Sequence, residues 1–250
     1  MFWKRVVSAI IFAVLVILVI QKGGLWGFLS IVSIIVVIGT IEFSELTIPK
    51  GNRLLLLINI PINLAFCYSP LKPDWINTNL IFCLAIILPF IYEIIKRKPN
   101  LALPNLSASV LCVLYVGWIF GYHLVLIRQM ADGREFIYLL MSIAWSSDIG
   151  AYLVGKRLGK HKVIVAISPK KSIEGYIAGL LFGIGASVGI CHWLLPNINL
   201  AHAVIVGLFM TIIGQIGDLA ESVLKRGANV KDSGKIMPGH GGILDRCDSI

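Results

Sequence analysis

Residues 200–221 read LAHAVIVGLFMTIIGQIGDLAE, and residues 222–248 continue with SVLKRGANVKDSGKIMPGHGGILDRCD. The first stretch is apolar and long enough to cross a bilayer as a helix, whereas the second is charged and rich in glycine. Five of the thirteen carboxylates and five of the twenty-two basic residues lie between residues 217 and 248. Because charge beside hydrocarbon is costly, ionisable residues at the end of a membrane span indicate a functional site.

Apolar stretches of this kind recur along the 250 residues. Hydrophobic residues make up 57% of the chain and charged residues 14%, and the mean hydropathy is +0.87, which excludes a soluble domain. We therefore predict an all-α, polytopic membrane protein with about eight transmembrane helices. The expected spans cover residues 6–20, 25–41, 54–69, 79–95, 106–127, 136–154, 173–195 and 200–221.

Two of these spans allow a second interpretation. The first resembles a secretion signal, because Lys4 and Arg5 precede a short apolar stretch. A poor cleavage site at residues 21–24 and the span that follows at once favour a membrane anchor instead. The span at 54–69 contains Pro61 between two asparagines, so a kinked or re-entrant segment is the alternative there.

The basic residues test both the number of spans and their orientation. With the N-terminus in the cytoplasm and the sides alternating, eighteen lysines and arginines fall inside and four fall outside. This bias follows the positive-inside rule and predicts a multi-pass protein of the bacterial inner membrane with cytoplasmic polar loops. The net charge of +9 then faces anionic lipid headgroups, and a nucleic-acid partner is not expected.

The character of the chain changes near residue 136. Residues 1–135 consist of spans and short loops, and we interpret them as a transmembrane scaffold. Residues 136–250 carry polar and glycine-rich signals within the spans, and we interpret them as the catalytic half. The spans at 136–154 and 200–221 both end on the cytoplasmic side, so Asp148 and Asp218 are expected at similar depth beside one pocket.

Carboxylates in this half favour a metal site. Asp218, Ser222 and Lys225 follow the spacing i, i+4, i+7 and share one face of a helix that continues past the membrane. Asp245 and Asp248, three residues apart, share a face of a helical turn. Carboxylates meeting in a cleft bind one or two hard cations, with Mg²⁺ favoured beside phosphate ligands. The alternative is ordinary lysine–aspartate pairing, and for Asp148 a buried pair with a lysine.

Basic residues in the same half favour phosphate binding. Arginine holds phosphate oxygens with two donors, whereas lysine acts as a point charge. The segments 168–171 and 239–242 combine lysines or glycines with turns that approach a phosphate closely. The alternative is that the positive-inside rule alone explains these residues. The candidates are Lys225, Arg226, Lys231, Lys235, Arg246, Lys170, Lys171 and His240.

The polar tail resembles a known signature. Its fixed positions are Ser222, Lys225-Arg226, Lys231-Asp232 and the run from His240 through Asp245-Arg246 to Asp248. Together they resemble the pattern of phosphatidate cytidylyltransferases, also called CDP-diacylglycerol synthases. Upstream segments are similar to the same family: Asp148–Tyr152, Ile167–Lys171, Glu174-Gly175 and Gly217–Leu219.

This resemblance implies a reaction and roles for residues. CTP and phosphatidate would give CDP-diacylglycerol and pyrophosphate with Mg²⁺, and a second cation, divalent or monovalent, is compatible with the family. Asp218 and Asp245 become the foremost metal ligands, followed by Asp148 and Asp248, and Lys225 joins Asp218, Asp245 and Asp248 as a catalytic residue. The resemblance makes Ser222, Arg226, Lys231, Asp232, His240, Arg246, Lys170 and Lys171 the substrate-binding candidates.

Two departures from the family pattern affect these expectations. Position 172 is Ser where the family leads us to expect Thr, which keeps the hydroxyl. The family also leads us to expect a further membrane span after Asp248, whereas the last residue of this sequence is Ile250.

Other functions remain as alternatives at this point. A CTP-dependent lipid kinase needs the same metal and nucleotide parts. A membrane transporter would carry charges near the midplane and repeated halves, whereas the charges here gather at one face. A CDP-alcohol phosphotransferase resembles a different pattern, which the residues after Asp132-Gly133 do not continue. The sequence leaves the oligomeric state open, a homodimer included.

Overall fold

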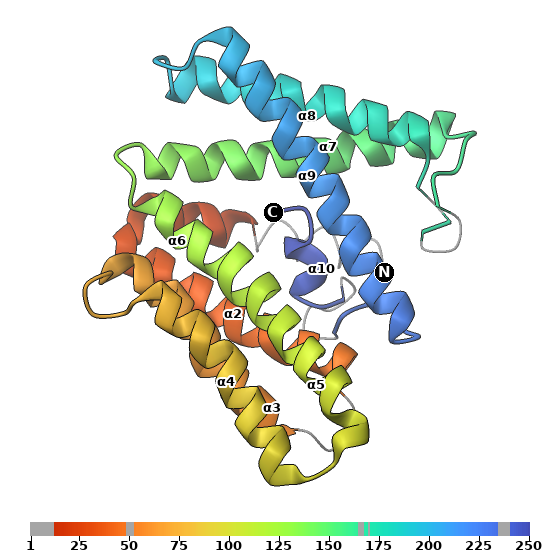
Figure 1. The fold of residues 1–250 in the computed structure, drawn as a ribbon. Helices are drawn as coiled ribbons and strands as arrows, with labels where there is room; N and C mark the ends of the chain where they lie inside the picture. The colour runs from red at the N-terminus through yellow and green to blue at the C-terminus, as the bar shows by residue number, and fades with distance from the viewer. Residues whose placement is uncertain (1–12, 49–52, 165–167, 170, 235–240) are drawn as a thin grey trace. The chain divides into compact units, whose positions relative to one another are not determined.

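A computed structural model describes residues 13–48, 53–164, 168–169, 171–234 and 241–250 (Figure 1). Helices make up the regular structure of these ranges, and no strand occurs within them. Seven of the described helices are long and apolar enough to cross a membrane, which confirms the prediction of a polytopic helical membrane protein. The expected span at 6–20 lies partly outside the described residues, and its described part belongs to a shorter apolar helix, Ala13–Lys22.

The chain folds as two compact units. Unit 1 comprises residues 1–130 and 232–245, and unit 2 comprises residues 131–231 and 246–250. The predicted division after residue 135 rests on composition, whereas the units are defined by packing. Packing groups residues 232–245, which come from the polar tail, with the amino-terminal helices.

Unit 1 is a bundle of apolar helices. Pro61 lies inside a helix that runs unbroken from Arg53 to Tyr68, so the span expected at 54–69 is helical throughout. A π-helical stretch joins two α-helices into one apolar segment, Pro99–Arg128. Besides Ala13–Lys22, the elements are α2 (Gly24–Thr47), α3 (Arg53–Tyr68), η1 (Ser69–Leu71), α4 (Thr78–Lys96), α5 (Pro99–Cys112), η2 (Val113–Tyr122) and α6 (His123–Arg128).

Hydrogen bonds between buried polar side chains connect helices of unit 1. Asn63 of α3 donates to Thr40 Oγ1 of α2 at 2.8 Å, and Ser109 of α5 donates to Asn59 Oδ1 of α3 at 2.6 Å. Such hydrogen bonds hold membrane helices together, because lipid offers these groups no alternative partner. Around them packs an apolar cluster of Ile62, Phe66, Ile81, Ala85 and Val113.

Unit 2 contains three long helices, α7 (Gly133–Leu158), α8 (Ile173–Leu194) and α9 (Leu200–Gly227). α7 and α8 lie side by side, and α9 crosses them (Figure 1). Ser172 caps the start of α8 by accepting from the N–H of Gly175 at 3.2 Å, and Asn199 caps α9 by accepting from His202 N–H at 2.9 Å. The two caps fix where α8 and α9 begin.

Close helix contacts in unit 2 depend on glycine. A Cβ at Gly150 of α7 would lie 2.6 Å from the ring of Phe182 in α8. A Cβ at Gly207 of α9 would lie 2.8 Å from both Ile184 and Ser187 of α8. The Ser187 hydroxyl in turn donates to the carbonyl oxygen of Ala203 at 2.7 Å. Small residues thus let the backbones of these membrane helices approach.

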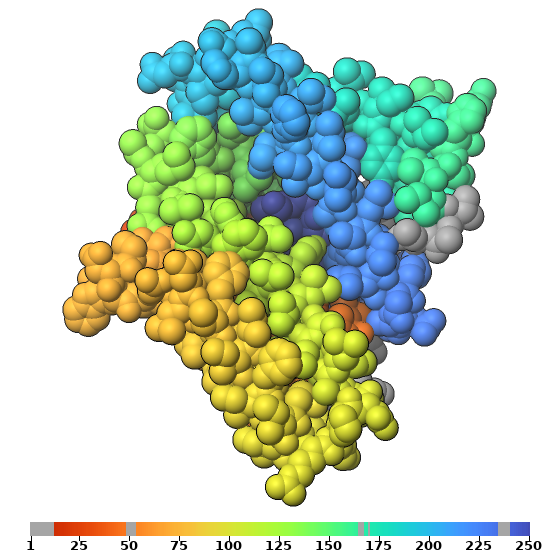
Figure 2. Space-filling view, viewed as in Figure 1, coloured from red at the N-terminus to blue at the C-terminus, as the bar shows by residue number. Residues whose placement is uncertain are grey.

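The surface of α9 is apolar along most of the helix, as lipid contact requires. This helix faces the viewer in Figure 2 and leaves Ile205, Phe209, Ile213 and Ile216 exposed. The apolar surface ends at the polar face that begins with Asp218.

The end of the chain packs against α9. α10 (Leu244–Cys247) is a single helical turn, after which residues 248–250 lie along α9. A Cβ at Gly214 would lie 2.7 Å from the carbonyl oxygen of Ser249, and a Cβ at Gly217 would collide with the carbonyl oxygen of Asp248. The two glycines therefore bring Asp248 close to the polar face of α9.

Candidate active site

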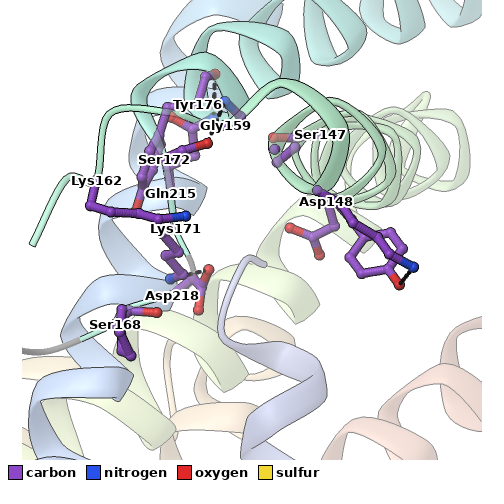
Figure 3. Close-up of a pocket in the computed structure, with 16 residues that line it drawn as sticks. Ser147, Asp148, Gly159, Lys162, Ser168, Lys171, Ser172, Tyr176, Gln215 and Asp218 are labelled. Atoms are coloured by element: carbon purple, nitrogen blue, oxygen red, sulfur yellow. Dashed lines mark hydrogen bonds and ion pairs between the residues drawn. The ribbon is translucent and has the colours of Figure 1, made fainter. Parts of the chain in front are cut away.

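A cavity of about 660 Å³ opens in unit 2 between α7, α8, α9 and the loop that joins α7 to α8 (Figure 3). Glycines of α7 and α8 contribute to its wall, while longer polar side chains reach into it. The polar side chains that line it are Ser147, Asp148, Tyr152, Lys156, Lys162, Ser168, Lys171, Ser172, Tyr176, Gln215 and Asp218.

The loop between α7 and α8 holds Lys171 in place. The N–H of Val163 donates to the carbonyl oxygen of Lys171 at 3.2 Å, and the N–H of Ile173 donates to the carbonyl oxygen of His161 at 2.9 Å. Glu174, in the first turn of α8, accepts from the His161 N–H at 3.2 Å and lies 2.6 Å from His161 Nδ1. These contacts fix the loop against the start of α8 and direct the lysine to the cavity.

An ion pair connects this loop with α9. Lys171 Nζ pairs with Asp218 Oδ2, and the two side chains are 23% and 31% exposed. Asp148 of α7 is exposed in the same cavity (Figure 3). Its Oδ2 accepts from the Ser249 hydroxyl at 3.2 Å. Residues from three distant stretches therefore meet here, as the expected depth of Asp148 and Asp218 predicts.

A second charged pair lies on the next turn of α9. Because α9 continues to Gly227, Asp218, Ser222 and Lys225 keep the i, i+4, i+7 spacing along one helix. Glu221 is completely buried, and its Oε1 lies 3.3 Å from Lys225 Nζ. The Lys225 side chain is only 11% exposed, so this pair lies largely away from water.

Asp248 adds a further carboxyl to the same region. Burial raises the pKa of Asp248 well above its usual range, and the charges of Asp218, Glu221 and Asp148 raise the pKa further. A hydrogen bond with Glu221 acts in the same direction. Carboxylates that raise one another's pKa share a small volume. This part of unit 2 therefore concentrates negative charge that a cation would relieve.

The donor chemistry of these residues fits a hard divalent cation. Oxygen ligands suit Mg²⁺, and Asp148, Asp218 and Asp248 supply carboxylates from three segments. Among the residues that the structure describes, no three Asp, Glu, His or Cys side chains already stand close enough to hold a metal ion together. Binding would therefore require Asp218 to turn from Lys171 toward the cation.

Asp245 belongs to unit 1, where a polar turn binds its carboxylate. Its Oδ2 accepts from the N–H groups of Ser233 and Gly242, both at 2.8 Å, and from the Ser233 hydroxyl at 3.0 Å. Gly241 has φ +89°, a conformation that favours glycine, and a Cβ there would collide with Asp245. Asp218 is a residue of the other unit, so its predicted meeting with Asp245 stays a prediction.

Other candidates lie along the end of α9 and the segment after it. Ser222 is partly buried on α9. Arg226 is exposed and donates to the carbonyl oxygen of Val230 at 3.2 Å. Lys231 and Asp232 are exposed. Their predicted contacts with substrate stay predictions.

Four candidates remain. Arg246 is exposed, and its charge acts on Asp148 within unit 2. This places a guanidinium near the carboxylates of the cavity. Lys170, Lys235 and His240 lie outside the described residues.

Sequence reasoning missed three polar residues. Glu221 and Glu42 are both completely or almost completely buried, at 0% and 2% exposed. Gln215 lines the cavity and donates to the carbonyl oxygen of Tyr176 at 3.1 Å. Glu42 follows directly after the expected span 25–41, so its place inside a membrane helix became visible only when α2 proved to continue to Thr47. Glu221 directly precedes Ser222, so it lies beside the predicted face of Asp218, Ser222 and Lys225. Spacing alone does not show whether a residue beside this face is buried.

The chain is similar to known proteins over nearly its whole length. The model of the Cytidylyltransferase family matches residues 3–250. The chain is 34% identical over 253 residues to a phosphatidate cytidylyltransferase of Bacillus subtilis (strain 168), covering 98% of this chain and 90% of that protein. It is 32% identical over 250 residues to one of Staphylococcus saprophyticus, covering 98% and 94%, and 36% identical over 178 residues to one of Staphylococcus haemolyticus, covering 71% and 67%.

The fold and the cavity define a multi-pass helical membrane protein with a polar, carboxylate-rich site. The match extends over nearly the whole chain, the scaffold helices included. The chain belongs to the cytidylyltransferase family. This confirms the resemblance that the signature between Ser222 and Asp248 indicates.

Proposed function

We propose that the protein transfers CMP from CTP to phosphatidate, forming CDP-diacylglycerol and pyrophosphate. The names of the three relatives support this substrate class, since the chain covers 90% and 94% of two of them. The single observation that carries the proposal is the ion pair of Lys171 with Asp218 in a cavity that also contains Asp148. The Lys171 ammonium suits a phosphate oxygen, and the carboxylates suit a metal ion that would itself bind phosphate oxygens.

The proposed reaction depends more on positioning the two substrates than on activating the attacking oxygen. An oxygen of the lipid phosphate attacks the α-phosphorus of CTP, a new P–O bond forms, and the bond to the β-phosphate breaks to release pyrophosphate. The attacking oxygen is already anionic, so a strong general base is not needed. Catalysis of this kind rests on alignment and on neutralising charge on the phosphates.

Basic residues of this chain fit the task of holding phosphates. Lys171 lines the cavity, and turning Asp218 toward a cation would release the ammonium to a phosphate oxygen. Arg246 lies near Asp148 and offers two parallel donors to a phosphate. Lys225 pairs with Glu221 and lies about two helical turns after Asp218 on α9, and it is proposed as a further basic residue of the site.

Asp148, Asp218 and Asp248 are the residues that would hold Mg²⁺ in unit 2. When bound, Mg²⁺ would supply positive charge against the triphosphate. Asp245 is proposed as a further ligand, because it is a fixed position of the signature that the chain shares with its family. The cluster has carboxylates enough for a second cation, divalent or monovalent.

We also propose an orientation. The bias of basic residues places the N-terminus and the loops after α7 and α9 in the cytoplasm of a bacterial cell, with the protein in the inner membrane. CTP then reaches the cavity from the cytosol. Phosphatidate enters sideways from the inner leaflet, where its phosphate already lies at the depth of the headgroups.

Labelled CTP tests the reaction directly. Membranes containing the protein, or the protein purified in detergent, are incubated with phosphatidate and Mg²⁺, and the lipid is extracted and counted. Label in the α-phosphate of CTP should appear in CDP-diacylglycerol, whereas label in the γ-phosphate should remain in water as pyrophosphate. Transfer of γ-label to the lipid would identify a kinase, and absence of both transfers would overturn the proposal.

A further inference from the structure

Glu42 is a carboxylate in the last two turns of the apolar helix α2, and it is 2% exposed. Its partners lie about two hundred residues later, in the segment 233–244 of the same unit. A buried charge in a membrane helix is costly unless it is fully paired. These contacts therefore have to offset the cost of burying the Glu42 carboxylate.

Both carboxylate oxygens of Glu42 accept hydrogen bonds from one turn of the chain. Oε1 accepts from the N–H of Ile243 at 3.0 Å, and Oε2 accepts from the N–H of Leu244 at 3.0 Å. Oε2 also lies 3.2 Å from the Ser233 hydroxyl, which donates to it. Two consecutive backbone groups and a side chain from the preceding segment of the chain are therefore tied to α2.

Steric fit around this carboxylate is tight. A Cβ built at Gly234 or at Gly242 would collide with the Glu42 carboxylate. Leu244 packs against the same helix, because a Cβ at Gly39 would lie 3.1 Å from its side chain. The turn therefore fits against Glu42 only with glycine at positions 234 and 242.

The same turn also holds Asp245. Ser233 and Gly242 donate their N–H groups to Asp245 Oδ2, while the next two N–H groups, of Ile243 and Leu244, go to Glu42. The Ser233 hydroxyl reaches both carboxylates but carries a single proton, so it serves one of them at a time. When Asp245 turns toward a ligand, Glu42 can still hold this hydroxyl and the turn.

We infer that Glu42 is a positioning residue that fixes the turn 241–245 against α2 and thereby orients Asp245 for cation binding. The role rests on the proposed function, in which Asp245 is a metal ligand. A carboxylate that merely filled the core would not need its acceptors aimed at consecutive N–H groups beside a ligand. Glu42 touches the backbone of the turn and acts through Asp245.

The test replaces Glu42→Gln and compares it with Glu93→Gln. Glutamine keeps the size of the side chain but presents an NH₂ group to a backbone N–H, so one acceptor is lost. Glu93 is a matched control, since it is a buried carboxylate of the same unit, 6% exposed, and it accepts from Asn105 at 2.8 Å. Both variants remove one intramembrane carboxylate from unit 1.

The first readout is amide hydrogen exchange of residues 241–248, measured without divalent cations. Glu42→Gln should speed exchange at the amides of Ile243 and Leu244 by about tenfold or more, the effect of losing one buried hydrogen bond. Glu93→Gln should leave exchange in this segment unchanged. Equal exchange in Glu42→Gln and the unchanged protein, or an equal rise in both variants, would overturn the inference.

The second readout separates positioning from loss of folded protein. Glu42→Gln should raise the Mg²⁺ concentration for half-maximal activity by about fivefold or more and lower kcat, with the KM for phosphatidate within about twofold. A fall in kcat with an unchanged Mg²⁺ requirement would contradict the role. If the unchanged protein forms no CDP-diacylglycerol, the proposed function fails, whereas hydrogen exchange still tests the hold of Glu42 on the turn.

Discussion

Asp218→Asn is the substitution whose effect follows most directly from the geometry of the cavity. Asparagine keeps the shape of the side chain and removes its charge. Two consequences for folding oppose each other. The ion pair with Lys171 is lost, which costs about 1 kcal/mol for a pair that water still reaches, whereas the repulsion that Asp218 exerts on Asp248 is relieved. The free energy of unfolding should therefore change by only about 1 kcal/mol or less.

The effect on turnover should be much larger. Loss of a main electrostatic group at a reacting centre typically lowers the rate by about 10²–10³-fold, or about 2.7–4 kcal/mol of barrier. We expect Asp218→Asn, and likewise Asp245→Asn, to lower turnover by at least ~100-fold. Because the variant at 218 should stay folded, its loss would report on chemistry rather than on stability.

Lys171→Met makes the companion experiment, because it removes the other half of the ion pair. If Asp218 binds the cation and Lys171 binds phosphate, the two variants should shift different parameters. Asp218→Asn should raise the Mg²⁺ concentration for half-maximal rate. Lys171→Met should raise the KM for CTP, and it should leave the Mg²⁺ requirement equal or lower, since positive charge next to the ligand is gone.

The assay is transfer of α-labelled CMP into extractable lipid, measured over a range of Mg²⁺ and CTP concentrations. Asp74→Asn is the control, since Asp74 is an exposed aspartate in the segment before α4. Near-normal turnover of Asp218→Asn at an unchanged Mg²⁺ requirement would refute the assignment of this residue as a ligand.

Three further predictions concern packing and charge. Glu221→Gln leaves the buried ammonium of Lys225 without its carboxylate and should lower stability by about 3 kcal/mol, seen as a lower Tm. The raised pKa of Asp248 means that the folded protein binds the proton of this carboxyl more tightly than the unfolded chain does. Without cations, the free energy of unfolding should therefore fall as pH rises above about 4. Asp248→Asn should reduce this dependence of Tm on pH in thermal melts. Gly150→Val should lower stability by about 1–3 kcal/mol through collision with Phe182, whereas Gly185→Ala, with open space around its Cβ, should not; a stable Gly150→Val would contradict the packing of α7 on α8.

The fold could be predicted because it depends on quantities that a sequence carries directly. The length and apolarity of each stretch decide whether a helix spans a bilayer, and seven spans follow from that alone. Even Pro61 did not break its helix, because neighbouring helices stabilise a membrane helix that contains proline. Asp148 and Asp218 both line one cavity, as we expected from their positions near the ends of two spans.

Contacts between distant segments could not be predicted in the same way. Pairing of Lys171 with Asp218 depends on how the loop before α8 folds back, which hydrogen bonds of His161 and Glu174 decide. Spacing along α9 favoured Asp218 and Lys225 but left the burial of Glu221 undecided, because a rotation of one residue moves a side chain by about 100°. The hydrogen bonds between Glu42 and the turn at 241–245 join residues about two hundred positions apart in the sequence. No local sequence pattern predicts such contacts.

Cation binding by the purified protein tests the central claim most directly. Mn²⁺, which can replace Mg²⁺ at oxygen ligands, is titrated with CTP present and followed by electron paramagnetic resonance. We predict saturable binding to the unchanged protein, weakened at least ~10-fold by Asp218→Asn and unaltered by Asp74→Asn, as expected for loss of one charged ligand. Equal Mn²⁺ affinity in all three proteins would contradict a cation site built on the carboxylates of α7, α9 and the end of the chain.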